Sequence, residues 1–489
     1  MKTVLCLAPL LLFLSAALGQ NELDGLRGAE THTYGTARFM GLGGAMGALG
    51  GDASVFSTNP AGFGIYRKSE VTMSMGYFST RAQTNLNGND LTTRQNNLGL
   101  NNLMLVLNDQ KNTSSGVISS TWGLGYNRMA NFYSVTNFND PNPQSSLLDP
   151  WQDRLNAAAG PFADELAFDV TPAYEAFLLD AFEQNGTFFH ANELHEGSMN
   201  KIIERTGSLA EWGGFYSANI NNRFYLGGSV NIVRLNYSEK STYSESDFDG
   251  AEFSPLREWE FNEDLNITGT AFKLKLGAIY RVNDNLRLGL AYHTPSYISI
   301  NDNYETDVQS VFEPENPGDA TEEYASFSPG GPLNYMQKQP GRAQASAGII
   351  LGKRGIIGLE YEYVNYSNIK FRDDLARIDF SDLNTDIEEI FGATHNVRAG
   401  LELRFENYFA RGGYRFNQSP YSSEIDISRN IHTYSVGAGY RKSSFFIDAA
   451  YSLMRVDEVE EFLFSPAYIN PATVRMQSGV FVLTGGFRW

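Results

Sequence analysis

Residues 270–281 read TAFKLKLGAIYR, and this short stretch decides what kind of structure the chain can form. Apolar Phe272, Leu274 and Leu276 alternate with Lys273 and Lys275. Successive side chains of a β-strand point to opposite faces of a sheet, so this period of two predicts a strand with one apolar and one charged face. In a soluble sandwich the apolar face would meet a core, whereas in a membrane barrel it would meet lipid.

The lengths of the connections separate these two cases. The same alternation recurs in SSFFIDAAYSLM (443–454) and ATHNVRAGLELRF (393–405). Between such segments, very short turns alternate with much longer connections, as in a barrel with tight turns on one side and long loops on the other. The short turns are 220–223, 282–285, 352–355, 405–407 and 441–444, and the long connections are 138–208, 240–262, 302–336, 372–391 and 457–471.

We therefore predict an all-β fold, a transmembrane antiparallel β-barrel of about 14 strands. An even number of strands predicts that both ends of the chain lie on the periplasmic side. The strands are expected to start near residues 68, 98, 117, 209, 223, 268, 285, 338, 354, 393, 407, 430, 444 and 473.

The start of the chain predicts export. Lys2, a short apolar run and the small residues before Gln20 are typical of a cleaved signal peptide over residues 1–19. The single cysteine, Cys6, lies inside this segment, so the mature chain would have no disulfide, zinc–thiolate site or cysteine nucleophile. No stretch of 18 apolar residues follows, so we expect no transmembrane helix. A net charge of −19 argues against a nucleic-acid partner.

The connection 138–208 has a different period. TPAYEAFLLDAFEQNG (171–186) places apolar side chains at helical spacing between a Thr-Pro start and a glycine stop, and SMNKIIERTG (198–207) repeats this pattern on a smaller scale. We predict a helical extracellular loop here. Its apolar faces either pack on one another and cap the barrel, or form an external groove for a hydrophobic ligand. The candidate groove residues are Tyr174, Phe177, Leu178 and Phe182.

The chain ends in GVFVLTGGFRW (479–489). This ending, with Phe487 and the terminal Trp489 on one face, resembles the carboxy-terminal signal read by the outer-membrane barrel assembly machinery. We therefore expect that machinery, together with outer-membrane lipid and lipopolysaccharide, to be partners of a monomeric barrel.

A glycine-rich segment, FMGLGGAMGALGGDASVF (39–56), precedes NPAGFG (59–64). These two elements resemble the amino-terminal plug of the FadL/TodX family of outer-membrane transporters for hydrophobic compounds. Later segments are similar to successive strands of that family, in the same order: LAYHTPSYISI (290–300), QPGRAQASAGI (339–349), LEYEYVNYSNIKF (359–371), HNVRAGLEL (395–403) and ARGGYRFNQSPYS (410–422).

The resemblance implies a plug over residues 20–66 and a barrel over 67–489. It also implies passive uptake of hydrophobic small molecules, such as long-chain fatty acids or aromatic hydrocarbons, with lateral exit near a kinked early strand. Pro60 restricts its own backbone and that of Asn59, which suits an anchoring turn. The candidate gating residues are Asn59, Pro60, Ala61 and Gly62, and the candidate residues lining the kinked strand are Trp122, Gly123, Gly125 and Tyr126.

Charged residues on the predicted strands would face the lumen. Glu360, Glu362, Arg398, Arg411 and Arg415 lie on three consecutive predicted strands and are candidates for a lumenal ion-pair network. Such a network would stabilise a polar interior, hold the plug or meet a ligand carboxylate.

Other functions fit less well. The histidines form no HExxH motif and the chain has no G-x-S-x-G elbow, so we expect neither catalysis, nor a cofactor, nor a metal. An open aqueous porin conflicts with the plug-like segment. A FadL-like barrel that serves as a non-transporting surface or secretion platform is the main alternative, because a fold alone does not determine function.

Overall fold

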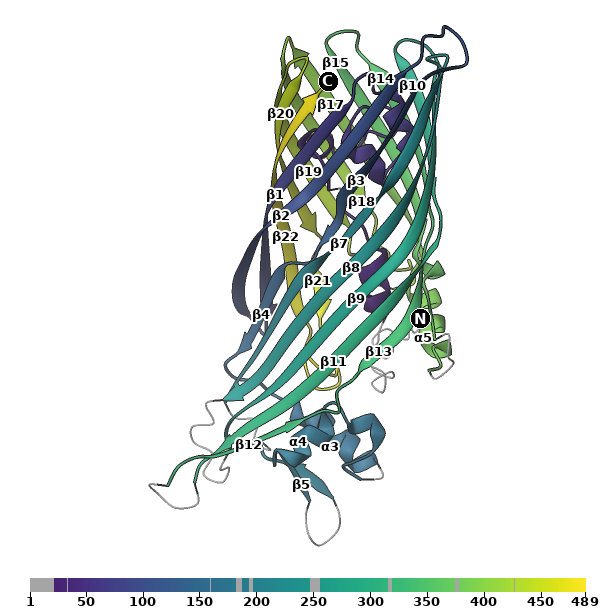
Figure 1. Cartoon of the computed structure of the whole chain (residues 1–489). Helices are drawn as coiled ribbons and strands as arrows, with labels where there is room; N and C mark the ends of the chain where they lie inside the picture. Colours follow the sequence, from purple (N-terminus) through teal and green to yellow (C-terminus); the bar gives the residue numbers. More distant parts are fainter. Residues whose placement is uncertain are drawn as a thin grey trace, which may run out of the picture.

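The computed structural model describes residues 22–489 except 33, 159, 182–186, 193–196, 247–255, 315–318, 374–377 and 426. The signal peptide predicted for residues 1–19 therefore lies outside the described residues. The strands form a closed antiparallel barrel of 14 strands, in which β1 pairs with both β2 and the last strand, β22 (Figure 1). The predicted fold class is confirmed.

Several barrel strands consist of two consecutive segments. The wall contains β1 (Glu70–Leu86), β2 (Asn89–Gln110), β3 (Val117–Asn131), β4 (Ser134–Asp140), β7 (Ser198–Ile220), β8 (Phe224–Ser246), β9 (Leu256–Arg281), β10 (Leu286–His293), β11 (Ser296–Phe312), β13 (Pro332–Gln339), β14 (Arg342–Ile350), β15 (Gly355–Asn365), β16 (Lys370–Arg372), β17 (Ala393–Phe405), β18 (Tyr408–Asn417), β19 (Ile431–Arg441), β20 (Phe445–Val456), β21 (Val459–Glu461) and β22 (Ala472–Arg488). The short strand β12 (Glu322–Phe327) pairs with the far end of β11.

The two ends of the barrel differ. At one end, tight turns join β7 to β8, β17 to β18 and β19 to β20, and the carboxy terminus lies among them (Figure 1). At the other end β7, β8, β9 and β11 project well beyond the rest of the wall. We call these the short-turn end and the long-loop end.

The outer surface changes in character along the projecting strands. On β8, the outward side chains of Phe224, Leu226, Val230 and Ile232 are exposed and apolar, and the outward residues become polar from Arg234 onward. On β9 the same change occurs between Phe272 and Thr270. An apolar outer band with a buried polar interior is the pattern of a barrel in a membrane, so the strands continue beyond the bilayer.

The segment 22–66 lies inside this barrel. It forms α1 (Glu22–Ala29), α2 (Ala37–Gly41) and two 3₁₀ helices, η1 (Ala53–Ser57) and η2 (Pro60–Ile65). Apolar side chains of this segment, including Phe39, Phe56 and Phe63, pack against wall residues such as Phe78 and Phe215. We call the part from 34 to 66 the plug, and α1 the arm.

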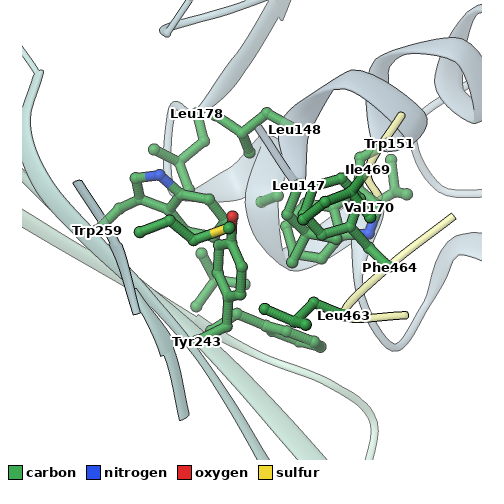
Figure 2. Packing of buried hydrophobic residues seen from close by; sticks show 14 of the residues in the cluster. Leu147, Leu148, Trp151, Val170, Leu178, Tyr243, Trp259, Leu463, Phe464 and Ile469 are labelled. Carbon is green, nitrogen blue, oxygen red and sulfur yellow. The ribbon is translucent and has the colours of Figure 1, made fainter. Parts of the chain in front are cut away.

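A separate apolar cluster closes the long-loop end (Figure 2). It joins α3 (Leu148–Ala157), η3 (Asp164–Leu166) and α4 (Val170–Glu175) to inward residues of the projecting strands. Trp151 on α3 lies 5.8 Å from Trp259 on β9 between ring centroids. We call this structure the cap; it also contains the hairpin of β5 (Leu179–Ala181) and β6 (Phe188–His190).

The structure corrects both helix predictions in this region. The helix predicted over 171–186 ends at Glu175, because Phe177 adopts a left-handed backbone and the chain turns back into β5. The helix predicted over 198–207 is wrong, since these residues form the start of β7 and every one of them pairs with a residue of β8.

Two further elements flank the arm. The 3₁₀ helix η4 (Tyr366–Asn368) and the helix α5 (Ser381–Ile390) bury Tyr366, Leu383 and Ile387 against it. Among the described residues, none of the helices is both long enough and apolar enough to cross a membrane.

Candidate functional site

The Asn-Pro-Ala turn is fastened to the barrel wall. Asn59 caps η2 by accepting a hydrogen bond from the Ala61 N–H (3.1 Å) and donates through Nδ2 to the carbonyls of Gly47 (2.9 Å) and Ala278 (3.3 Å). One side chain thus joins the turn, the glycine-rich segment and β9.

Two wall glycines make room for this turn. Gly227 on β8 and Gly277 on β9 are cross-strand partners. A Cβ on Gly277 would lie 2.0 Å from Asn59 Oδ1, and one on Gly227 would lie 2.6 Å from the Pro60 carbonyl oxygen. The turn therefore sits where the wall has no side chains.

Residues beside the turn bind buried charges. The Ser57 hydroxyl donates to Glu211 Oε1 (2.6 Å), and Lys275 Nζ donates to the Phe56 carbonyl (3.3 Å) and to the same carboxylate. His293 Nε2 lies 2.6 Å from the Thr58 carbonyl oxygen. Sequence reasoning missed Glu211 and His293 as plug contacts; the only signal was that both are polar residues on an inward strand face.

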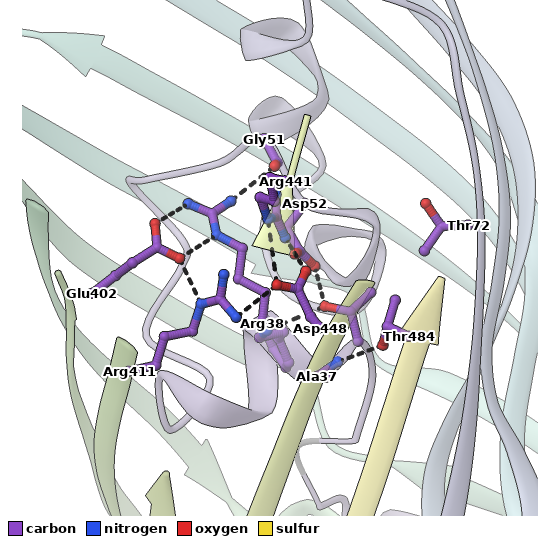
Figure 3. A network of polar contacts seen from close by, with 12 residues as sticks. Ala37, Arg38, Gly51, Asp52, Thr72, Glu402, Arg411, Arg441, Asp448 and Thr484 are labelled. Carbon is purple, nitrogen blue, oxygen red and sulfur yellow. Dashed lines mark hydrogen bonds and ion pairs between the residues drawn. The ribbon is translucent and has the colours of Figure 1, made fainter. Parts of the chain in front are cut away.

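A second set of contacts holds α2 (Figure 3). Arg38 makes two hydrogen bonds to the Glu402 carboxylate, of 2.9 and 3.0 Å, and a third to the Gly51 carbonyl (3.0 Å). Arg411 bridges Glu402 (2.7 Å) and Asp448 (2.8 Å). Arg38 is the only charged residue between 37 and 51, which is the signal that could have identified it.

The predicted lumenal charges form two groups rather than one. Glu360 and Glu362 on β15 both bind Arg398 on β17, and Glu360 also accepts the Gly47 N–H of the plug (2.9 Å). Arg411 belongs to the other group, in which it binds Glu402 together with Arg38 and also binds Asp448. Arg415 faces the same interior, but in the described part of the chain it has no ion-pair partner and donates only a long hydrogen bond, of 3.4 Å, to Thr433.

A small polar cavity of about 30 Å³ lies between the plug and the wall. Its lining carries two lysines, two arginines and two histidines, but only one carboxylate, Glu362; the basic residues are Lys273, Lys275, Arg342, Arg398, His32 and His293. Lys275 is paired with Glu211. Lys273 is buried, at 5% exposure, and its Nζ has no hydrogen-bond or ion-pair partner among the residues that the structure describes. The Nε atoms of Arg342 and Arg398 are buried without a hydrogen-bond partner. Arg398 binds Glu360 and Glu362, and Arg342 Nη1 lies 3.5 Å from Glu362, so the surplus positive charge is that of Lys273 alone, beside two spare arginine donors.

Next to this cavity the wall is apolar. Inward side chains of β8, β9 and β11, including Leu235, Ile267 and Ile298, surround Leu26 of the arm. Side chains of β13 and β14 hold the arm by its carbonyls: Gln337 on β13 donates to Gly25 (2.6 Å), Gln339 to Gly28 (2.5 Å), and Arg342 on β14 to Ala29. The arm thus fills an apolar chamber and is held there through its backbone and through Arg27, which lies 3.5 Å from Glu239 and 4.6 Å from the centroid of the Tyr237 ring.

The wall is interrupted between β2 and β3. Their hydrogen-bonded ladder ends at the pair Asn102–Asn127, and the pairing of β3 with β7 shifts register between Arg128 and Ala130. Side chains fill the gap: Arg128 Nε donates to the Leu100 carbonyl (3.1 Å), and the amides of Asn97 and Asn131 meet at 3.2 Å. His32, which precedes the plug, lies against this place, and its N–H donates to the Met129 carbonyl (2.7 Å).

The predicted residues of the kinked strand lie just before this interruption. Gly123 and Gly125 point inward, toward Phe215 and Met104. Trp122 points outward and is 51% exposed, and Tyr126 lies beside Trp212, with ring centroids 4.6 Å apart. These two aromatic residues can line only the outer side of an opening.

The four candidate groove residues do not form one surface. Leu178 is fully buried in the cap, and Tyr174 packs between Phe162 and Phe188. Phe177 is exposed and contacts Tyr324, whereas Phe182 lies outside the described residues. At the other end of the chain, Phe487 and Trp489 stack at 6.2 Å on the outer surface, beside the seam between β1 and β22.

Comparisons with known proteins identify this architecture. Among solved structures, the chain is similar to a FadL homologue of Pseudomonas aeruginosa, with 15% identity, a TM-score of 0.56 and coverage of 94% of this chain and 99% of that one. It is also similar to the toluene transporter TodX of P. putida, with 12% identity, a TM-score of 0.53 and coverage of 94% and 99%. At these identities the likeness shows the fold alone.

The sequence comparisons add the family. A search of curated proteins found no match. The family model described as outer membrane protein transport protein (OMPP1/FadL/TodX) matches residues 211–462, which is more than half of the chain. The chain therefore belongs to the OMPP1/FadL/TodX family of outer-membrane transport proteins.

Proposed function

We propose that the protein carries long-chain amphiphiles of the fatty-acid class across the outer membrane of a Gram-negative bacterium. The observation that carries this proposal is the contact between the apolar chamber around the arm and the basic cavity beside it. Ala271 belongs to the chamber, and Lys273, two residues along β9, faces the cavity. A ligand with an apolar chain and a carboxylate matches both.

The cavity favours this class over an aromatic hydrocarbon. Burial of a cation without a partner is costly, so the surplus charge near Lys273 is best satisfied by an anionic ligand group. A neutral hydrocarbon would leave Lys273 and the spare arginine donors unpaired. The apolar chamber supplies the hydrophobic lining that a long chain needs.

Passage requires two movements. The arm must leave the chamber, which breaks its hydrogen bonds to Gln337 and Gln339 and the contacts of Arg27 with Glu239 and Tyr237. The ligand would then leave sideways between β2 and β3, where side-chain contacts replace the backbone ladder. We assign the long-loop end to the cell exterior and the short turns and carboxy terminus to the periplasm, as the even number of strands suggests.

Uptake by cells that lack the protein, with and without its restoration, tests this function. Labelled oleate and labelled toluene are the two probes. We expect the native chain to restore oleate uptake, and Lys273→Met to reduce it at least about fivefold with the barrel still inserted. Restoration of toluene uptake alone would reverse the substrate assignment. If neither probe enters, the protein acts as a surface or secretion platform instead.

A second experiment tests the lateral exit between β2 and β3. Asn97→Cys with Asn131→Cys places two thiols where the amides now meet, in a mature chain predicted to have no other cysteine. A thiol cross-linker should stop oleate uptake in the double variant and leave both single variants active. Unchanged uptake in the cross-linked protein would reject lateral exit and leave transport itself standing.

A further inference from the structure

A cleft of about 400 Å³ lies outside the transport path, at the long-loop end, where four segments meet. These are the turn between β1 and β2 at Asn87, the loop after β4, the start of β7 at Met199 and the chain before β22 at Asn470. It shares no residue with the basic cavity.

Uncharged amides dominate its rim. Asn87, Asn142, Gln144 and Asn470 are exposed, and Asn89 is half-buried. Amide side chains donate and accept hydrogen bonds at once, as hydroxyl-rich ligands require. Among the residues that line the cleft there is no lysine, arginine or histidine, which argues against an anionic ligand.

The one carboxylate is already satisfied. Asp140 is buried at 3% exposure, and its two oxygens accept from Asn87 Nδ2 (2.6 Å) and from the Asn142 N–H (3.0 Å). Burial, together with the neighbouring Asp153 carboxylate, raises the pKa of Tyr468 to about 12, so that its hydroxyl stays neutral. The cleft therefore lacks the free charged oxygens that a cation site needs.

The floor is apolar. Pro143, Met199 and Ile469 are buried beneath the rim. A pyranose ring has the matching construction, with a C–H face on one side and hydroxyl groups around its edge. The rim amides are partly paired among themselves, since Asn470 Nδ2 donates to Asn87 Oδ1 (3.4 Å) and Asn87 Nδ2 to Asp140. A hydrophobic cargo would cover their remaining donors and acceptors, and an ion would gain nothing from the apolar floor.

We propose that this cleft is a binding site for a neutral sugar residue of a surface glycan. Its volume lies at the lower end of the range for small-molecule sites, roughly 300–1,000 Å³, and suits one or two rings. The site is distinct from the transport function: it would tether the long-loop end to a glycan without passing the sugar through the barrel. The glycan is either the oligosaccharide of lipopolysaccharide in the same membrane or a free polysaccharide.

Saturation-transfer NMR on the full-length barrel in detergent tests the proposal. The probes are glucose, galactose, mannose, N-acetylglucosamine, maltose and the neutral oligosaccharide released from the host lipopolysaccharide. We expect saturation of at least one probe and a loss of signal of about tenfold in Asn142→Ala/Asn470→Ala. Asn236→Ala, an exposed asparagine on the outer face of β8, is the matched control and should bind as the native chain does.

The different probes distinguish the two sources of the glycan from each other and from a metal effect. Signal from the lipopolysaccharide oligosaccharide alone assigns the site to that lipid, and signal from maltose or a monosaccharide assigns it to a free glycan. The proposal is overturned if no probe is saturated, or if the double variant binds as well as Asn236→Ala. Binding that disappears with EDTA and returns with Ca²⁺ while both variants stay equal would also overturn it, in favour of a metal effect elsewhere.

Discussion

Lys275 Nζ lies 2.6 Å from Glu211 Oε2, and both side chains are essentially inaccessible to solvent, at 1% and 0% exposure. The pair also binds the plug, through the Ser57 hydroxyl and the Phe56 carbonyl. Removing one partner leaves the other charge buried, which costs about 3–5 kcal/mol. We predict that Glu211→Gln and Lys275→Met each loosen the plug and raise vancomycin sensitivity.

The double variant Glu211→Gln/Lys275→Met is the control for this prediction. It leaves no unpaired charge, so it should be less sensitive to vancomycin than either single variant. Equal sensitivity of all three variants would mean that the ion pair does not hold the plug.

Arg38 is predicted to keep α2 seated. Its replacement by alanine removes two hydrogen bonds to Glu402, and each bond to a charged group contributes about 1.5–3 kcal/mol. Arg38→Ala should therefore raise the frequency of open events in planar bilayers at least about tenfold. Arg404→Ala, an exposed arginine on the same strand as Glu402, should behave as the native protein. An unchanged frequency of open events in Arg38→Ala would contradict the prediction.

Gly277→Ala should displace the Asn-Pro-Ala turn. The added methyl group would overlap Asn59 Oδ1, so either the side chain must rotate away from Gly47 and Ala278 or the turn must shift. We expect a lower melting temperature of the folded barrel and more open events in planar bilayers. Gly485→Ala on β22 is the matched control, because a Cβ added there would have no neighbouring atom within 4 Å. If both glycine variants melt alike, the close approach has no energetic role.

Glu245 should hold the cap to β8. Its carboxylate accepts from Ser146 Oγ, the Leu147 N–H, Tyr243 Oη and Asn192 Nδ2, at 2.7 to 3.2 Å. Glu245→Gln exchanges one of the accepting oxygens for a donor, so trypsin should cleave after Arg154 in the cap several-fold faster. Glu258→Gln, on the exposed face of β9, should not change the cleavage rate. Equal rates would show that the apolar cluster alone holds the cap.

The accuracy of the sequence prediction differs between the two ends of the barrel. At the short-turn end, starts predicted at 223, 285, 354, 407 and 444 differ by one residue from Phe224, Leu286, Gly355, Tyr408 and Phe445. At the long-loop end, β2, β7 and β9 begin nine to twelve residues before the predicted 98, 209 and 268. These strands leave the membrane there, and their outer residues become polar, so the hydrophobic alternation disappears while the backbone pairing continues.

The helix predicted over 198–207 failed for a related reason. Met199, Ile202 and Ile203 fit helical spacing, but Met199 and Ile203 also share one face of a strand and pack beneath the cap. Three apolar residues cannot distinguish the two periods, and only the long pairing with β8 decides.

The sequence pointed to lumenal charges but did not identify which residues contact the plug. Cross-strand register explains why Glu360 meets Arg398, since the two are direct partners on β15 and β17. Arg38, Glu211 and His293 contact residues far away in the chain, and no local pattern reveals which wall position faces the plug.

The hydroxyl of Thr484 links three parts of the chain. It accepts the Ala37 N–H of the plug (2.7 Å) and lies 2.8 Å from Ser74 Oγ on β1, while Thr484 itself belongs to the closing strand β22. Closure of the sheet and seating of the plug are therefore joined at one hydroxyl: a change that separates β1 from β22 also removes a hydrogen bond from the plug.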